Sequence, residues 1–247
     1  MSVSIWSYSM LVITLAIPLY CVWEGDKTQR NVISGKQTRL EAYASTMVLL
    51  WVPTLYLLVG LYGKQISTAE LSLVWVGSAN NWLGALGVLV MAGYFSLNLV
   101  STNNARDTHS TLEAQLEHVA WLMPRSSKEL TCFTLGVSLS AGICEELLFR
   151  GFLWFLMSPF LGLWPALLIS SLLFGVAHAY QGWLHVVRTS IMGLVLGVIL
   201  WLTETIWIAI TVHALVNIYG GLLAYIVISN SGRKQASCVT KFPFNRI

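Results

Sequence analysis

The sequence has few charged residues and no long polar tract. Only 10% of its 247 residues are Asp, Glu, Lys or Arg, whereas 56% are hydrophobic and the mean hydropathy is +0.69. Soluble domains carry about 25% charged residues, so this composition excludes that class and indicates a polytopic membrane protein. The net charge of +3 is small and gives no reason to expect a nucleic-acid partner. The sequence also lacks internal repeats and a second soluble domain.

Metal-binding motifs are missing as well. The cysteines lie far apart without a C-x-x-C pair, which argues against a zinc knuckle or a redox pair and predicts buried or loop thiols. There is no H-E-x-x-H motif either. We therefore expect neither a metal nor another cofactor. The cysteines are Cys21, Cys132, Cys144 and Cys238.

Long apolar runs predict the fold class. Runs of about 18 or more apolar residues mark membrane spans, and their number predicts an all-α polytopic transmembrane helix bundle of about seven spans, with a range of six to eight. The run 71–100 is interrupted at Ser78-Ala-Asn-Asn81, so we expect one span there, starting near Trp82. The first run is long for a signal-peptide core and follows no basic residue, which indicates a retained anchor. The predicted spans are 5–23, 44–63, 82–100, 130–157, 163–181, 189–203 and 205–228.

Basic residues predict the orientation in the membrane. They gather in the loops 24–43 and 101–129 and in the tail, and all three segments fall on the cytoplasmic side if seven spans follow an outside N-terminus. The chain is then a multi-pass protein of the cytoplasmic membrane in a prokaryote, or of the endoplasmic reticulum in a eukaryote. The basic residues are Lys27, Arg30, Lys36, Arg39, Arg106, Arg125, Lys128, Arg233, Lys234, Lys241 and Arg246.

The chain is expected to form one membrane domain with three regions. Residues 1–129 hold the N-terminal spans and an amphipathic surface helix near 111–123, where Ser110-Thr-Leu-Glu113 has the spacing of a capping box. Residues 130–228 form the core that carries the polar motifs described below. Residues 229–247 form a cytoplasmic tail.

Three charged side chains interrupt the fourth predicted span. Glu145, Glu146 and Arg150 lie in the apolar stretch 141–151, where three uncompensated charges would cost about 8 to 10 kcal/mol. Glu146 and Arg150 are four residues apart, so they can pair on one helical face. Glu145 has no local partner and must be satisfied from distant spans, with His178 the foremost candidate.

Few polar groups lie inside the later spans, and they fall at similar depths. Counting about 1.5 Å per residue from the outer span ends, Glu145 lies roughly 18 Å deep, His178 roughly 22 Å, His213 roughly 12 Å and Asn217 roughly 18 Å. These side chains can therefore meet at one level. Such a set could merely join helices by hydrogen bonds, but intramembrane ionisable groups are costly and usually functional.

The set has the equipment for amide hydrolysis. A carboxylate inside an apolar bundle is a stronger base than one in water, and with an imidazole it can hold and deprotonate a water molecule. A second imidazole and an amide can donate hydrogen bonds to a developing oxyanion. No serine or cysteine stands in a recognisable nucleophile motif.

The motifs Glu145-Glu146-x-x-x-Arg150, Phe174-x-x-x-His178 and His213-x-x-x-Asn217 resemble those of the CAAX-protease and bacteriocin-processing family of glutamic intramembrane proteases. The Ras-converting CAAX endopeptidases are related to it. The resemblance covers about residues 130–228 and implies an intramembrane endopeptidase that cleaves near a membrane-anchored peptide end, with lipid bilayer and a membrane peptide or protein as its partners. Members differ in whether that end is a prenylated CAAX tail, and neither the substrate nor the oligomeric state follows from the sequence.

The resemblance also implies roles for these residues. Glu145 and His178 would activate the water, and His213 and Asn217 would form the oxyanion hole. Glu146 would assist, Arg150 would hold Glu146, and Phe174 would pack beside the site.

Two other functions fit parts of the pattern. A zinc-dependent membrane protease could use the same glutamates and histidines as ligands, although Arg150 would disfavour a dication there. A transporter, or a non-catalytic scaffold such as an immunity protein, could also carry buried polar residues, but transporters usually show repeated halves or interrupted helices.

Overall fold

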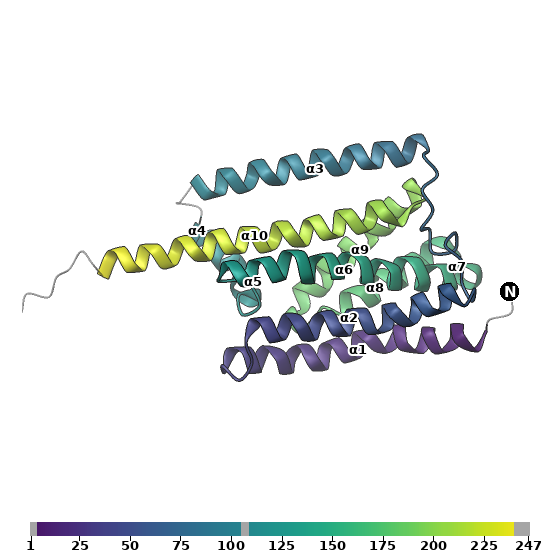
Figure 1. Cartoon of the computed structure of the whole chain (residues 1–247), viewed down its shortest axis with the longest axis horizontal. Coiled ribbons are helices and arrows are strands. Elements are labelled where there is room, and N and C mark those ends of the chain that lie inside the picture. Colours follow the sequence, from purple (N-terminus) through teal and green to yellow (C-terminus); the bar gives the residue numbers. More distant parts are fainter. Residues whose placement is uncertain (1–3, 105–108, 240–247) are drawn as a thin grey trace, which may run out of the picture.

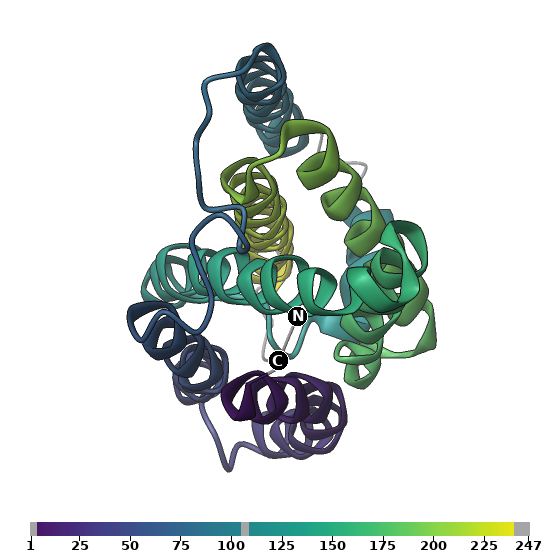
Figure 2. The same ribbon diagram turned by 90° about the vertical axis from the view of Figure 1, so that its right-hand side faces the viewer.

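The computed structural model describes residues 4–104 and 109–239, and this part of the chain is helical without any strand. Six of its helices are long and apolar enough to cross a membrane. Figures 1 and 2 show that they run roughly along one axis as a bundle. The chain is thus an all-α, multi-pass integral membrane protein, as the sequence predicts, and six long helices fall within the expected range of six to eight.

The helices have the following bounds. The long separate helices are α1 (Ile5–Ile33), α2 (Arg39–Tyr62), α3 (Ala79–Asn104), α9 (Trp183–Thr203) and α10 (Ile206–Val239). A further long helix over residues 127–161 comprises α5 (Ser127–Thr131), η3 (Cys132–Ser138), α6 (Leu139–Glu145), η4 (Glu146–Leu153) and α7 (Trp154–Leu161). The shorter elements are α4 (His109–Leu116), η2 (Glu117–Val119), α8 (Leu163–Val176) and η5 (Ala179–Gln181).

The helix over residues 127–161 forms the centre of the bundle, and it is the most buried of the six long helices. In Figure 2 other helices lie around it, with α1 and α2 on one side and α10 on another. Every residue of η4 is buried, and η4 is π-helical rather than α-helical. π-Helical turns are rare and are frequently found at functional sites. The charged stretch therefore lies in the most buried of the long helices.

The fifth predicted span, 163–181, is shorter in the structure. Helix α8 has 14 residues, a length of about 21 Å, which falls short of the roughly 30 Å of a bilayer core. The chain reverses before it at Gly162, whose φ of +85° favours glycine. Helix α8 ends at Val176, and His178 follows with its backbone outside the helical region (φ −102°, ψ 10°). The second motif histidine therefore stands at a helix end inside the bundle.

The other long helices also differ in their bounds from the prediction; α9, for example, begins at Trp183 and α10 continues to Val239. Helix α1 ends at Ile33, ten residues after the predicted end of the span at residue 23. Polar residues alone do not end a helix, and the first positive φ comes at Gly35 (+74°). Helix α3 starts at Ala79 within the polar interruption, where the Ser78 hydroxyl accepts a hydrogen bond from the Asn81 N–H at 3.2 Å. Asn81 is fully buried and its amide donates to the carbonyl oxygen of Thr203. The interruption is thus a cap and an anchor to the end of α9.

Helix α3 lies at the edge of the bundle. Its contacts are mainly with α10 and, less, with α9, and Figure 2 shows it apart from the remaining helices. Phe95 of α3 stacks on Tyr219 of α10, with ring centroids 4.2 Å apart, and the Tyr219 hydroxyl donates to Asn98 Oδ1 at 2.7 Å. Most of the surface of α3 therefore faces outward, where its apolar side chains suit a lipid environment.

The basic segments of the chain share one end of the bundle. In Figure 1 the turn between α1 and α2, the start of α5 and the C-terminal part of α10 all lie on the left, opposite the N-terminus. Arg106 and the tail residues Lys241 and Arg246 lie outside the described residues. The surface helix predicted near 111–123 corresponds to α4 and η2, which cover His109–Val119; since α4 begins at His109, Ser110 lies inside it rather than before it.

Candidate active site

A buried ion pair forms the base of the site. The Arg150 guanidinium donates from Nη1 to Glu146 Oε1 at 2.9 Å, and both side chains are completely shielded from solvent. The pairing expected from their four-residue spacing is therefore present. The plane of the guanidinium also lies against the Phe174 ring, with Cζ 4.1 Å from the ring centroid. A cation on an aromatic face is favourable when both are desolvated.

His213 connects both glutamates to α10. Its Nδ1 lies 2.8 Å from Glu146 Oε1, so that this oxygen accepts from the imidazole and from Arg150 at once. Its Nε2 lies 3.5 Å from Glu145 Oε2, within ion-pair range but longer than a usual hydrogen bond. The two glutamates and Arg150 sum to one negative formal charge, and a protonated His213 would bring the sum to zero.

Phe174 connects the second histidine to the ion pair. The His178 Nδ1 lies 2.9 Å from the carbonyl oxygen of Phe174, one turn back on α8. The Phe174 ring contacts both imidazoles edge-on, with centroids 4.8 Å from that of His178 and 5.8 Å from that of His213. The Phe174 ring thus lies against the Arg150 guanidinium and both imidazoles.

From the sequence, His178 is the foremost candidate partner of Glu145, and the structure differs on this point. His213 is the near neighbour, whereas no hydrogen bond or ion pair joins His178 to Glu145 in the described part of the chain. Asn217 lies one turn beyond His213 on α10, is half-buried, and makes no hydrogen bond to the charged cluster among the described residues. Depth along each helix was predictable, but the direction in which each side chain points was not.

Several polar atoms of this cluster have no hydrogen-bond partner among the described residues. They are Glu145 Oε2, Glu146 Oε2, Arg150 Nε and Arg150 Nη2. Buried groups of this kind usually bind water or a ligand, because leaving them unpaired costs about 1 to 3 kcal/mol each. The cluster thus offers carboxylate acceptors beside guanidinium and imidazole donors. In the same described residues, no group of three or more His, Cys, Asp or Glu side chains is arranged to hold a metal ion.

Gly142 allows α6 and α10 to approach closely. A Cβ at this position would lie 2.9 Å from the carbonyl oxygen of Ile210 and 3.0 Å from the Ala214 Cβ, both on α10. These distances are shorter than ordinary contacts, so a side chain would push α10 away from α6. Because α10 carries His213 and α6 carries Glu145, this glycine sets the separation between the imidazole and the carboxylates.

Gly142→Ala is therefore expected to reduce the activity of the site more than the stability of the fold. A displacement of about 1 Å at reacting groups can lower a rate about 100-fold, and we expect a loss of at least about tenfold in kcat. Gly93→Ala on α3 is the matched control, because nothing lies within 4 Å of a Cβ there. Equal turnover by the two variants, measured as the peptide cleavage that the sequence motifs lead us to expect, would show that the close approach has no functional role.

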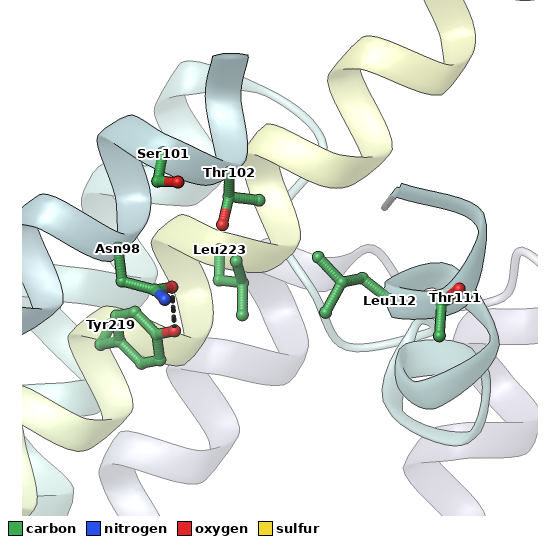
Figure 3. Close-up of a pocket in the computed structure, with 7 residues that line it drawn as sticks. All are labelled: Asn98, Ser101, Thr102, Thr111, Leu112, Tyr219 and Leu223. Atoms are coloured by element: carbon green, nitrogen blue, oxygen red, sulfur yellow. Dashed lines mark hydrogen bonds between the residues drawn. The ribbon is translucent and has the colours of Figure 1, made fainter. Parts of the chain in front are cut away.

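A separate cavity of about 470 Å³ lies between α3, α4 and α10 (Figure 3). Tyr219, which lines it, comes six residues after His213 on α10, but neither the glutamates nor the histidines of the cluster line this cavity. The cavity therefore belongs to the edge of the bundle rather than to the charged cluster. Its lining residues are Asn98, Ser101, Thr102, Thr111, Leu112, Tyr219 and Leu223.

The bundle and its charged cluster define a multi-pass membrane protein with an ionisable site inside its helical core. Comparison with known families then identifies the core: residues 127–219 match the Rce1-like family, described as type II CAAX prenyl endopeptidase Rce1-like. The matched segment contains all three motifs, and the match confirms the family expected from them. This family implies a CAAX-type intramembrane endopeptidase, and hence a hydrolase. Comparisons with curated proteins and with solved structures gave no match.

Sequence reasoning did not single out two residues that shape the site. Gly142 lies three residues before Glu145, and a small residue close to a motif in a membrane helix is a signal for tight helix packing. Tyr180 lies two residues after His178, and its ring is near-parallel to the imidazole, with an interplanar angle of 21°. No spacing rule could have identified Tyr180, because the chain leaves the helix before it.

Proposed function

We propose that this protein is a glutamic intramembrane endopeptidase that hydrolyses a peptide bond near a membrane-anchored end of its substrate. The observation that carries the proposal is the cluster of Glu145, Glu146 and His213 inside a membrane-spanning bundle, with carboxylate oxygens that have no hydrogen-bond partner among the described residues. The family match supports the same reaction class. The peptide end is held at the bilayer by its own anchor, and a prenylated CAAX-type tail is the anchor that the family description names.

In this mechanism Glu145 is the general base. Its carboxylate takes a proton from water as the water oxygen attacks the carbonyl carbon of the scissile amide. The same proton passes to the amide nitrogen as the C–N bond breaks, which leaves a new carboxylic acid and a new amine and returns Glu145 to its carboxylate form. Glu145 suits this role because its side chain is 15% exposed, whereas Glu146 is fully enclosed and already accepts two hydrogen bonds.

His178 assists the water through Nε2. A carbonyl oxygen only accepts, so the bond to the Phe174 carbonyl fixes the N–H at Nδ1 and leaves Nε2 as an acceptor. Asn217, and His213 when its Nε2 carries a proton in addition to the Nδ1 proton that it donates to Glu146, donate to the oxyanion that forms on the carbonyl oxygen. Glu146 holds His213 for this task, and Arg150 holds Glu146.

The proposal is tested by comparing the membrane peptides of cells that contain the wild-type protein with those of cells that contain Glu145→Ala. We expect peptides with an intact anchored end to accumulate in the variant and their cleaved forms to appear with the wild type. Identical peptide populations at equal protein levels would contradict an endopeptidase and favour a scaffold or a transporter.

Substrates found in this way are then cleaved by purified protein with and without a strong chelator. We expect the rate to stay the same after metal removal, because the proposed base is a carboxylate and not a metal-bound hydroxide. A rate that is lost with the chelator and restored by Zn²⁺ would instead identify a zinc-dependent membrane protease.

A further inference from the structure

The ring of Tyr180 lies beside the imidazole of His178, outside the three motifs. We infer that Tyr180 is a positioning residue for His178, and that Gly25 of α1 fixes Tyr180 in this role. The inference rests on the proposed function, since it concerns the histidine that assists the water. It assigns a function to α1, a helix in which the sequence offers no motif.

The backbone alone does not fix the His178 ring. The residue stands between the end of α8 and the short 3-10 turn η5, so that no α-helical turn continues through it. One hydrogen bond, from Nδ1 to the Phe174 carbonyl at 2.9 Å, holds one edge of the imidazole. A ring held at one edge can still rotate about that contact, so the direction of Nε2 depends on what packs beside it.

Tyr180 packs beside the imidazole. The ring centroids of Tyr180 and His178 lie 6.4 Å apart, with an interplanar angle of 21°. The tyrosine is itself restrained, because Trp121 contacts it edge-on with centroids 6.4 Å apart and Gln181 Nε2 donates to its hydroxyl at 2.9 Å. Trp121 is buried, whereas Tyr180 and His178 are half-buried, so this group of rings reaches from the packed interior towards the surface of the bundle.

Helix α1 contacts Tyr180 through a glycine. A Cβ at Gly25 would lie 2.3 Å from Tyr180 Cγ and 2.6 Å from Tyr180 Cβ, closer than any side chain can approach. Only glycine therefore allows α1 to lie against the tyrosine in its present place. Any larger residue would drive the Tyr180 ring away from α1, and His178 would lose the near-parallel ring on that side while it keeps the edge-on contact with Phe174.

The charge state of Tyr180 fits a neutral positioning group. The phenol of a tyrosine has an ordinary pKa of about 10, well above neutral pH. The phenol therefore stays protonated and adds no charge beside the carboxylate that is proposed to act as the base. Its contribution to the site is the shape of its ring.

The test compares Tyr180→Leu with Tyr180→Phe in the full chain, reconstituted in lipid nanodiscs. Tyr180→Phe keeps the ring, and we expect its kcat to stay within about threefold of the wild type. Tyr180→Leu removes the ring, and we expect kcat to fall about 10- to 100-fold with a smaller change in KM. Gly25→Ala should resemble Tyr180→Leu, whereas Gly87→Ala on α3, where a Cβ meets nothing within 4 Å, should not.

NMR of the labelled imidazole of His178 provides a readout that needs no cleavage. The signal is assigned with His178→Gln, and we expect Tyr180→Leu to shift or broaden it while Tyr180→Phe leaves it in place. A folded Tyr180→Leu with unchanged kcat and unchanged His178 signals would overturn the inference, even if its thermal stability is lower. If the wild type cleaves no peptide but Tyr180→Leu still moves the His178 signals, the proposed function fails and the positioning contact stands.

Discussion

Replacing Glu145 with alanine is expected to abolish peptide-bond cleavage, with kcat/KM falling by about 10²- to 10⁴-fold, the range for loss of a general base. The carboxylate is the proposed proton acceptor, and no other carboxylate of the cluster can replace it, because Glu146 is fully buried and already bonded to Arg150 and His213. His178→Ala is expected to lower the rate by a similar factor. The rates are measured on a purified substrate peptide by mass spectrometry.

The control for Glu145→Ala is Glu117→Ala, which removes an exposed carboxylate from η2, outside the charged cluster. Both variants must insert and unfold like the wild type before their rates are compared. If Glu145→Ala and His178→Ala, correctly folded, still cleave every substrate of the wild type, a glutamate-dependent mechanism is wrong. If only His178→Ala retains activity, His213 is the histidine that assists the water, in line with its shorter distance to Glu145.

Arg150→Ala is expected to cause the largest loss of stability, about 3 to 5 kcal/mol, the usual cost of breaking a buried ion pair. The substitution removes the donor at 2.9 Å from Glu146 and leaves that carboxylate enclosed with His213 as its one remaining partner among the described residues. It also removes the guanidinium from the Phe174 ring. The measurement is thermal unfolding in detergent together with the yield of inserted protein.

Two further variants separate the ion pair from a general loss of charge. Arg188→Ala removes an exposed arginine from α9 and should leave the unfolding temperature unchanged. The double variant Glu146→Gln with Arg150→Met removes both charges together, and we expect it to recover much of the stability while remaining inactive. Wild-type yield and unfolding temperature for Arg150→Ala would show that the pair does not stabilise the fold.

The sequence predicted the residues of the site better than their mutual contacts. The Glu146–Arg150 pair follows from helical spacing alone, since both partners lie on one helix. The contact between His213 and the glutamates depends on how α10 is rotated and how closely it packs on α6, which Gly142 determines. Counting the rise per residue gives the depth of a residue in the membrane but not the rotation of its helix about the helix axis. The sequence could therefore not show that His213, rather than His178, lies next to Glu145.

The fold was predictable to the same degree. Hydropathy finds spans because every backbone polar group must be satisfied inside the segment that crosses the lipid. It does not reveal that η4 is π-helical, because π-helical turns depend on packing around the backbone. It also predicted 163–181 as a span of ordinary length, although α8 ends at Val176.

The separation of the charged cluster along the chain has a consequence for synthesis at the membrane. Glu146 and Arg150 leave the ribosome within one helical turn of each other, so each can neutralise the other as their segment inserts. His213 follows 67 residues after Glu146. Until α10 is made, Glu145 lies in the nascent bundle without the imidazole that faces it in the finished protein. The insertion of α10 therefore completes the burial of the Glu145 carboxylate, which is already in the membrane by then. Chains truncated before α10 should be recognised by quality control and degraded.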